Sequence, residues 1–383
     1  MKSNVLKIIL FIFFLAVTLF GPVRETVTNS TTFFSRYYDE GKYQAYKQQY
    51  YNSQYVKKKN PGIMVDNSLE SFAAGIFLRG LNPILIVHDQ PPLGRYMISL
   101  SLVLFENPNT IMLVFLFSSL VGIYLISFEA TKNVLLSFIP PMIFANEPLF
   151  LSKFSYTPLL EPIQLPFIVF SIYFFIKGEQ SKKYLIWFVA TSIMLGFVIS
   201  TRFFALGAVL LFSLCVVLPF TKQWKKKTVA FFLTLPFSLL VLLSAYTVTI
   251  MSGYTPLQIF GIQKYILVYH KSQLTMPFTF LDLILFNKWH TWWAGNAILN
   301  DYQWIIVWPV AFVLSIVYFV FALIKRNMPT TADKTMLSWV ICYSLFLCLG
   351  KTSTRYFLPL VPFLYIASTS FLQKVYLMYY KKR

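Results

Sequence analysis

The chain is dominated by long apolar runs that contain almost no charge. A helix of about 20 apolar residues crosses the hydrocarbon core of a bilayer. The runs that approach this length are 6–22, 109–128, 133–149, 160–176, 184–201, 203–220, 228–250, 304–325, 336–350 and 356–373. They predict an all-α polytopic membrane protein with about 10–11 transmembrane helices, folded as a single transmembrane domain over residues 1–383.

The composition excludes the other broad classes of protein. Of the 383 residues, 57% are hydrophobic and 12% are charged, whereas a soluble domain has about 25% charged residues. A soluble globule could not cover this much apolar surface, and a disordered chain needs low hydrophobicity. The three cysteines all lie in apolar runs, which argues against a disulfide framework and against a cysteine-ligated metal site.

The net charge of +19 indicates the orientation of the chain rather than a nucleic-acid partner. Lys and Arg of membrane proteins gather in cytoplasmic loops. The basic clusters between the predicted spans, together with both termini, fall on one side, which we assign to the cytoplasm. The acidic residues gather on the opposite face, in or next to two long external loops, 22–108 and 251–303.

Two parts of the first loop need a separate interpretation. Residues 93–105 are apolar but short for about 30 Å of hydrocarbon, so we expect a re-entrant or tilted element and not a further span. Residues 23–65 are polar and carry seven tyrosines. Tyrosine rings favour the boundary between lipid and water, so we expect this stretch to lie on the outer interface.

An amphipathic helix is predicted after this stretch. Apolar residues at positions 69, 72, 73, 76 and 77 follow helical spacing, as in a short helix that lies flat on the membrane. A capping box of Asn67 and Glu70 would explain both residues structurally. It would leave Asp66 free to point elsewhere.

A turn with two prolines follows this helix. Pro91 and Pro92 forbid helix up to that point, and the apolar 93–105 element begins directly afterwards. Asp89 and Arg95 would therefore be held at the bilayer surface beside Asp66. The alternative is a simple helix-start turn with interfacial charges.

Several motifs resemble, in the same order, those of the dolichyl-phosphate-mannose–protein mannosyltransferases and their bacterial relatives. The first loop of that family runs from an acidic pair, through a helix that ends in Gly, to a D-x-H-P-P-L-G-K motif. Similar features here are Asp66, Phe72-Ala73, Gly80 and residues 89–95 (DQPPLGR). Four later segments are also similar to family motifs. Residues 155–162 (SYTPLLEP) resemble S-R-x-x-L-L-D, and residues 196–202 (GFVISTR) resemble G-L-A-L-S-T-K. Tyr269-His270 with 289–293 (WHTWW) resemble Y-H followed by W-W-x-W, and residues 355–359 (RYFLP) resemble R-Y-x-x-P.

The sequence also departs from the family pattern. The acidic pair is Asp66-Asn67, Gln90 stands where the family has His, and Arg95 and Arg202 stand where it has Lys. Residues 23–65 match no family segment, and their Asp39-Glu40 pair is a rival for the catalytic acid.

The resemblance implies the GT-C class of membrane glycosyltransferases, which includes the lipid A aminoarabinose transferases. Such an enzyme moves a sugar from a polyprenyl-phosphate donor to an acceptor hydroxyl on a protein, lipid or glycan, with inversion, at the extracytoplasmic face. It needs no nucleotide-binding domain, and the sequence has no GxGxxG run. Asp66 would be the general base, and Asp89 would orient a substrate or help bind a divalent cation, although no cofactor is firmly implied.

Basic and polar residues of the matching motifs are the expected substrate ligands. Guanidinium groups bind two phosphate oxygens at once, so Arg95, Arg202 and Arg355 are candidates for the donor phosphate; their alternative is snorkelling to lipid headgroups. Glu161 and His270 are candidates for substrate binding. The alternative for Glu161 is an acid that stabilises a helix N-terminus, and the alternative for His270 is an interfacial position. His88, Asp89 and His270 do not have the spacing of a metal motif, so no metal ligand is assigned. Three tryptophans, Trp289, Trp292 and Trp293, could stack on sugars or form an interfacial belt.

A transporter or flippase of polyprenyl lipids or small molecules is the alternative function. Transporters carry ionisable residues near the middle of their spans. Here the middle regions have almost no charge and the acidic residues lie at the outer face. This distribution favours surface chemistry over transport.

Overall fold

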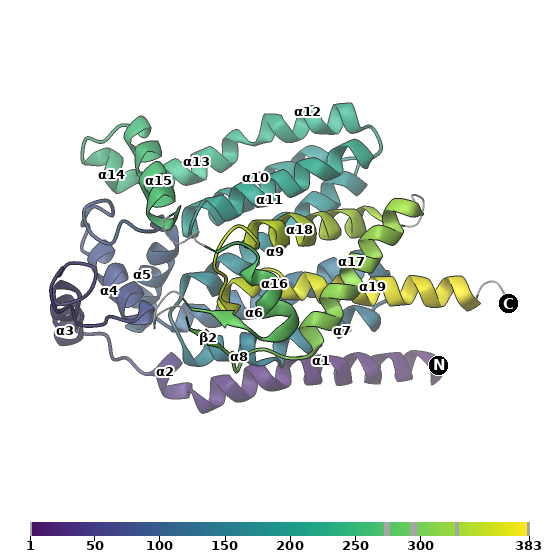
Figure 1. Ribbon diagram of the computed structural model, residues 1–383, viewed down its shortest axis with the longest axis horizontal. Helices are drawn as coiled ribbons and strands as arrows, with labels where there is room; N and C mark the ends of the chain where they lie inside the picture. The colour runs from purple at the N-terminus through teal and green to yellow at the C-terminus, as the bar shows by residue number, and fades with distance from the viewer. Residues whose placement is uncertain (1, 272–275, 292–296, 326–328, 381–383) are drawn as a thin grey trace.

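The computed structural model describes residues 2–271, 276–291, 297–325 and 329–380. Its main body is a bundle of helices that run side by side along the long axis (Figure 1). The bundle helices are α1 (Lys2–Thr28), α6 (Thr110–Thr131), α7 (Ile139–Ala145), α8 (Pro148–Ser155), α9 (Leu160–Gln180), α10 (Tyr184–Thr201), α11 (Ala205–Val217), α12 (Trp224–Thr234), α13 (Pro236–Ala245), α17 (Val307–Ile324), α18 (Thr331–Leu347) and α19 (Val361–Tyr380).

The other elements gather at one end of this bundle, which we call the site end. Both chain termini lie at the opposite end, the terminal end (Figure 1). The site-end elements are α2 (Ser30–Phe34), α3 (Glu40–Tyr51), α4 (Asp66–Leu78), α5 (Leu93–Phe105), α14 (Thr247–Met251), α15 (Pro256–Lys271), α16 (Thr279–Phe286) and the antiparallel pair β1 (Trp289–His290) and β2 (Ile298–Leu299). The predicted helical membrane fold is confirmed.

Six helices of the described chain are long and apolar enough to cross a membrane. They are Val5–Thr28, Thr110–Thr131, Leu160–Gln180, Tyr184–Thr201, Trp224–Ala245 and Val307–Ile324. Two other predicted spans, 133–149 and 203–220, coincide with shorter apolar helices, Leu136–Ala145 and Ala205–Phe220. The two remaining predicted spans, 336–350 and 356–373, fall on α18 and α19, which are not among these six helices. The α19 helix starts at Val361, later than predicted, because a 3-10 helix, η4 (Thr354–Phe357), precedes it.

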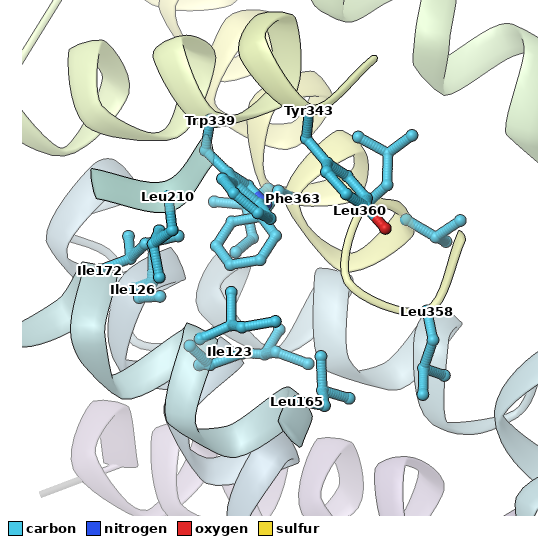
Figure 2. Close-up of a cluster of buried hydrophobic side chains, with 14 of the residues drawn as sticks. Ile123, Ile126, Leu165, Ile172, Leu210, Trp339, Tyr343, Leu358, Leu360 and Phe363 are labelled. Carbon is cyan, nitrogen blue, oxygen red and sulfur yellow. The ribbon is translucent and has the colours of Figure 1, made fainter. Parts of the chain in front are cut away.

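The core between the bundle helices is aromatic and aliphatic (Figure 2). The indole ring of Trp339 stacks on Tyr343 at 4.8 Å between ring centroids, and its Nε1 donates to the Pro359 carbonyl at 2.9 Å. Ile172 and Leu210 are fully buried in the same cluster. This packing fixes α18 and α19 against α9 and α11, and so fixes the loop between them that bears Arg355.

The α5 helix enters and leaves at the site end. The Tyr38 backbone N–H, just after α2, donates to the Glu106 carbonyl at 3.1 Å, and Thr110 at the start of α6 donates to the Phe33 carbonyl at 2.5 Å. These contacts place the C-terminal end of α5 beside α2, and Figure 1 shows the α5 helix among the site-end elements. This agrees with the expected re-entrant or tilted element.

The prediction that α4 lies flat on the membrane is wrong. Nine consecutive residues of α4, from Leu69 to Phe77, are buried, because α3 covers one side of the helix and α5 the other. The tyrosines of the 23–65 stretch supply much of this cover: Tyr50 packs on Phe72 at 4.9 Å between ring centroids, and Tyr43 is buried. They form a small core with α4, so the expectation that this whole stretch lies on the lipid interface is also wrong.

Candidate active site

An ion pair joins two of the predicted site residues. Asp66 is the first residue of α4, and Arg355 lies in η4. The Arg355 Nη1 atom is 2.6 Å from the Asp66 Oδ2 atom, although 289 positions separate the two residues in the chain. The side chains are 48% exposed for Asp66 and 31% for Arg355, so solutes can reach the pair.

Glu161 extends this pair into a chain of four charges. The Nε atom of Arg355 is 3.7 Å from Glu161 Oε1, and the same carboxylate oxygen is 3.0 Å from Nη2 of Arg202. The guanidinium groups of Arg202 and Arg355 both lie 5.3 Å from the Tyr356 ring centroid. We call Asp66, Arg355, Glu161 and Arg202 the ionic chain.

The antiparallel pair α9 and α10 explains how Glu161 and Arg202 meet. Glu161 lies in the first turn of α9, and Arg202 is the C-cap residue of α10. Their helices therefore bring both side chains to the site end. The Oε1 atom of Gln90 accepts a hydrogen bond of 2.9 Å from the Phe203 backbone N–H, which ties the proline turn to the residue after Arg202. Gly94 allows this close approach, because a Cβ there would lie 2.9 Å from Thr201 Cγ2.

A second cluster of charged side chains, centred on Arg95, lies beside the ionic chain. Arg95 is fully buried. Its Nε donates to Glu70 at 2.7 Å, its Nη2 donates to Asp89 at 3.0 Å, and its Nη1 donates to the Val87 carbonyl. With these contacts Arg95 joins α4, α5 and the proline turn, and no part of its side chain is exposed to a donor phosphate.

The predicted capping box at α4 is absent, and Asn67 and Glu70 make other hydrogen bonds instead. The N-cap position is Val65, without a side-chain hydrogen bond. The Asn67 side chain accepts from the Ser68 N–H at 2.8 Å, whereas Glu70 turns inward to Arg95. Burial raises the pKa of the Glu70 carboxyl to about 6, although the neighbouring Arg95 opposes this change. Sequence reasoning explained Glu70 locally and so missed its partner 25 residues later.

A cavity opens beside the ionic chain. Its open space is about 760 Å³, including solvent at its mouth. Its lining combines polar residues, such as Arg202, Lys351 and Tyr356, with apolar ones, such as Leu206, Phe346 and Leu347. A lining of this mixed character suits a ligand that joins an anionic group to a hydrocarbon chain.

Two lysines near this site were not predicted from the sequence. Lys351 lines the cavity, and its Nζ donates to the Thr291 carbonyl at 3.2 Å. Lys153, at the end of α8, is 4% exposed and lies close enough to Glu161 and Arg355 to interact with them electrostatically. Lys153 lies two residues before the SYTPLLEP segment that resembles the family motif, and this position could have identified it from the sequence.

The rival acidic pair serves α3. Asp39 is the N-cap of this helix and accepts from the Lys42 N–H at 2.7 Å. Glu40 pairs with Arg79. Neither residue lines the cavity; of the ionic chain, Arg202 lines it, and Asp66 is linked to Arg202 through Arg355 and Glu161.

Some of the remaining predicted residues lie outside the described part of the structure. His270 lies in α15, but its side chain is outside the described part of the structure, and so are Trp292 and Trp293. The ring centroid of His88 is 5.2 Å from that of Tyr265. Among the described residues, no three His, Cys, Asp or Glu side chains are grouped so that they could hold a metal ion.

Comparisons with known proteins bear on the fold that carries this site. Residues 110–251 match the family described as dolichyl-phosphate-mannose-protein mannosyltransferase. ArnT from Cupriavidus metallidurans, in a crystal structure bound to undecaprenyl phosphate, is similar over 81% of this chain and 56% of its own, with a TM-score of 0.57 and 15% identity. The chain has the GT-C fold.

A second GT-C protein supports this assignment. The archaeal oligosaccharyltransferase AglB from Archaeoglobus fulgidus, in complex with an inhibitory peptide and a dolichol-phosphate, is similar over 97% of this chain and 51% of its own, with a TM-score of 0.55 and 12% identity. This GT-C chain thus spans little more than half the length of either protein. No curated protein matched the sequence.

Proposed function

We propose that this GT-C chain is a glycosyltransferase that moves a sugar from a polyprenyl-phosphate donor to an acceptor hydroxyl on a protein, lipid or glycan. The ionic chain beside the cavity carries the proposal. It sets a carboxylate that can accept a proton next to cations that can hold a phosphate leaving group. In ArnT and AglB the same fold binds undecaprenyl phosphate and dolichol-phosphate.

The donor would lie across the cavity. Its phosphate would meet Arg202 and Lys351, and its isoprenoid chain would lie along Leu206 and Phe346. Arg355, next to Tyr356 at the edge of the cavity, would complete the phosphate site. We assign Glu161 to holding Arg202 and Arg355 apart in the orientation that the phosphate needs, since it contacts both.

Asp66 would act as the general base. The acceptor oxygen would bond to the anomeric carbon from the face opposite the phosphate, the bond from that carbon to the phosphate oxygen would break, and the hydroxyl proton would pass to the Asp66 carboxylate. The phosphate would leave with the bonding electrons, stabilised by the arginines. Such a displacement inverts the anomeric centre. Asp89, whose side chain is 27% exposed, would orient a substrate, and His270 remains a proposed substrate ligand.

The site end would face away from the cytoplasm. Basic side chains gather at the terminal end, where Lys177 pairs with Glu129 at 2.9 Å and Lys225, Lys226 and Lys227 begin α12. Cytoplasmic loops are the usual place for such clusters. Residues 1–383 would act as one transmembrane domain, with the loops 22–108 and 251–303 at the outer face.

A transfer assay tests this function. The purified protein in detergent is incubated with labelled polyprenyl-phosphate sugars and with cell-envelope extract as the acceptor. We expect labelled product that requires the lipid phosphate. Movement of labelled lipid phosphate across vesicles, without transfer from any donor, would instead support the flippase alternative.

A further inference from the structure

A second hollow lies at the terminal end, away from the proposed active site. It is a groove between α11 with η2 (Leu218–Phe220), the end of α17 and the start of α18, with about 1400 Å³ of open space. Its lining is almost entirely apolar, with Lys334 as its charged residue. The apolar lining includes Val216, Phe220, Phe319, Leu323, Leu337 and Ile341.

The groove and the active-site cavity are lined by different residues. The cavity uses Tyr343 and Leu347 of α18, whereas the groove uses Lys334 and Ile341 of the same helix. The two sets of lining residues have no member in common. We therefore consider the occupant of the groove separately from the donor.

The mouth of the groove is positively charged. The Lys334 Nζ atom donates to the Phe220 carbonyl at 3.2 Å, and this single acceptor leaves further ammonium donors for a ligand. Lys222 follows Phe220 by two residues, and Lys325 directly follows α17. The neighbouring carboxylate does not cancel this charge, because Asp333 is fully buried and bonded to Ser370 and Lys374.

We propose that this groove binds one anionic phospholipid from the leaflet at the terminal end. The acyl chains would lie against the apolar lining, which offers water no hydrogen-bond partner. The phosphate headgroup would meet Lys334 at the mouth. Basic pockets between transmembrane helices recognise anionic headgroups in this way. The proposal does not depend on the glycosyltransferase activity.

The native cysteines provide a direct probe of this site. Cys342 lines the groove, whereas Cys348 ends α18 nearer the site end and serves as an internal control. The full-length protein in detergent is titrated separately with phosphatidylglycerol, with phosphatidylcholine of the same acyl chains, and with a polyprenyl phosphate. Modification by an apolar maleimide is followed by mass spectrometry. Phosphatidylglycerol is expected to slow modification of Cys342 at lower concentrations than phosphatidylcholine, with no change at Cys348.

Two substitutions separate the headgroup from the groove. Lys334→Gln is expected to weaken protection by phosphatidylglycerol about fivefold, since one lysine near a lipid phosphate contributes about that factor. Lys57→Gln, in an exposed loop at the site end, is the matched control and is expected to change nothing. Ala322→Trp, which fills the groove, is expected to lower the number of lipids retained in native mass spectrometry by one.

Three results would overturn the proposal. Equal protection by both lipids would exclude recognition of the anionic headgroup. Unchanged modification of Cys342 with every lipid would exclude the site. Stronger protection by polyprenyl phosphate than by phosphatidylglycerol would identify the occupant as a donor-type lipid instead.

Discussion

Arg355 lies between the carboxylates of Asp66 and Glu161. Its Nη1 atom is 2.6 Å from Asp66 and its Nε atom is 3.7 Å from Glu161. A phosphate that enters the cavity would compete with Asp66 for this guanidinium, because both are anions that accept from the same N–H groups. Donor binding would then release the Asp66 carboxylate to accept a proton, which would link donor binding to activation of the proposed base.

The guanidinium of Arg355 should be needed for more than its charge. Arg355→Lys keeps the positive charge but loses the planar donors that bridge two anions. We expect kcat/KM for the polyprenyl-phosphate donor to fall about 10- to 100-fold, as for a lost hydrogen bond to a charged group. Arg36→Lys, an exposed arginine at the site end, should leave kcat/KM unchanged. Equal activity of Arg355→Lys and wild type would exclude this role.

The buried pair of Arg95 and Glu70 should matter for stability. Arg95→Met leaves the Glu70 carboxylate buried without its partner, so we expect a loss of about 3–5 kcal/mol in the free energy of unfolding. Arg79→Met removes a solvent-screened pair with Glu40, together with the contact of Arg79 on the Tyr43 ring, and should cost clearly less than Arg95→Met. Thermal unfolding in detergent measures both.

A double variant tests the cause of that loss. Combining Arg95→Met with Glu70→Leu removes both charges and should recover most of the stability lost in the single variant. A double variant as unstable as Arg95→Met alone would show that packing around Arg95, and not the unpaired charge, is responsible.

The path of α5 can be tested by labelling. In a background with the three native cysteines replaced by Ser, single cysteines are placed at Glu106, Tyr302 and Lys182, and a membrane-impermeant maleimide is added to sealed vesicles of known orientation. Glu106→Cys should react from the same side as Tyr302→Cys, because the α5 segment begins and ends at the site end. Reaction from the side of Lys182→Cys would mean that α5 crosses the membrane.

The cavity should control the donor affinity. Leu206→Trp would fill the space next to Arg202 without touching Asp66, so we expect the KM for the donor to rise at least about tenfold with a smaller change in kcat. Leu349→Trp, on a residue that is 60% exposed and does not line the cavity, is the control. An unchanged KM in Leu206→Trp would place the donor elsewhere.

Hydropathy predicted the bundle because a membrane span is a local property. About 20 successive apolar residues decide it, whatever they later touch. Glu161, Arg202 and Arg355 were also within reach of the sequence, since each lies at the end of a predicted span and the site-end loops bring these ends together. Which atoms meet there required the structure.

The errors came from residues whose partners are distant in the chain. Glu70 fits the spacing of a capping box, but a buried arginine 25 residues later competes for it. The tyrosines of residues 23–65 suit a lipid interface, but the apolar face of α4 was free to bury them. Glu147, for which no role was predicted, also has distant partners: it is 2% exposed inside the bundle, where Tyr365 donates to it at 2.5 Å and Trp308 at 3.1 Å.

The role of Asp66 as the base is tested most directly by comparing Asp66→Asn with Asp39→Asn in the transfer assay. The two substitutions are chemically identical, and Asp39 only caps α3. We predict that Asp66→Asn lowers the rate of transfer about 10²- to 10⁴-fold while donor binding persists, and that Asp39→Asn stays near wild type. Retained transfer by Asp66→Asn, with loss in Asp39→Asn, would contradict the assignment and move the base into the 23–65 stretch.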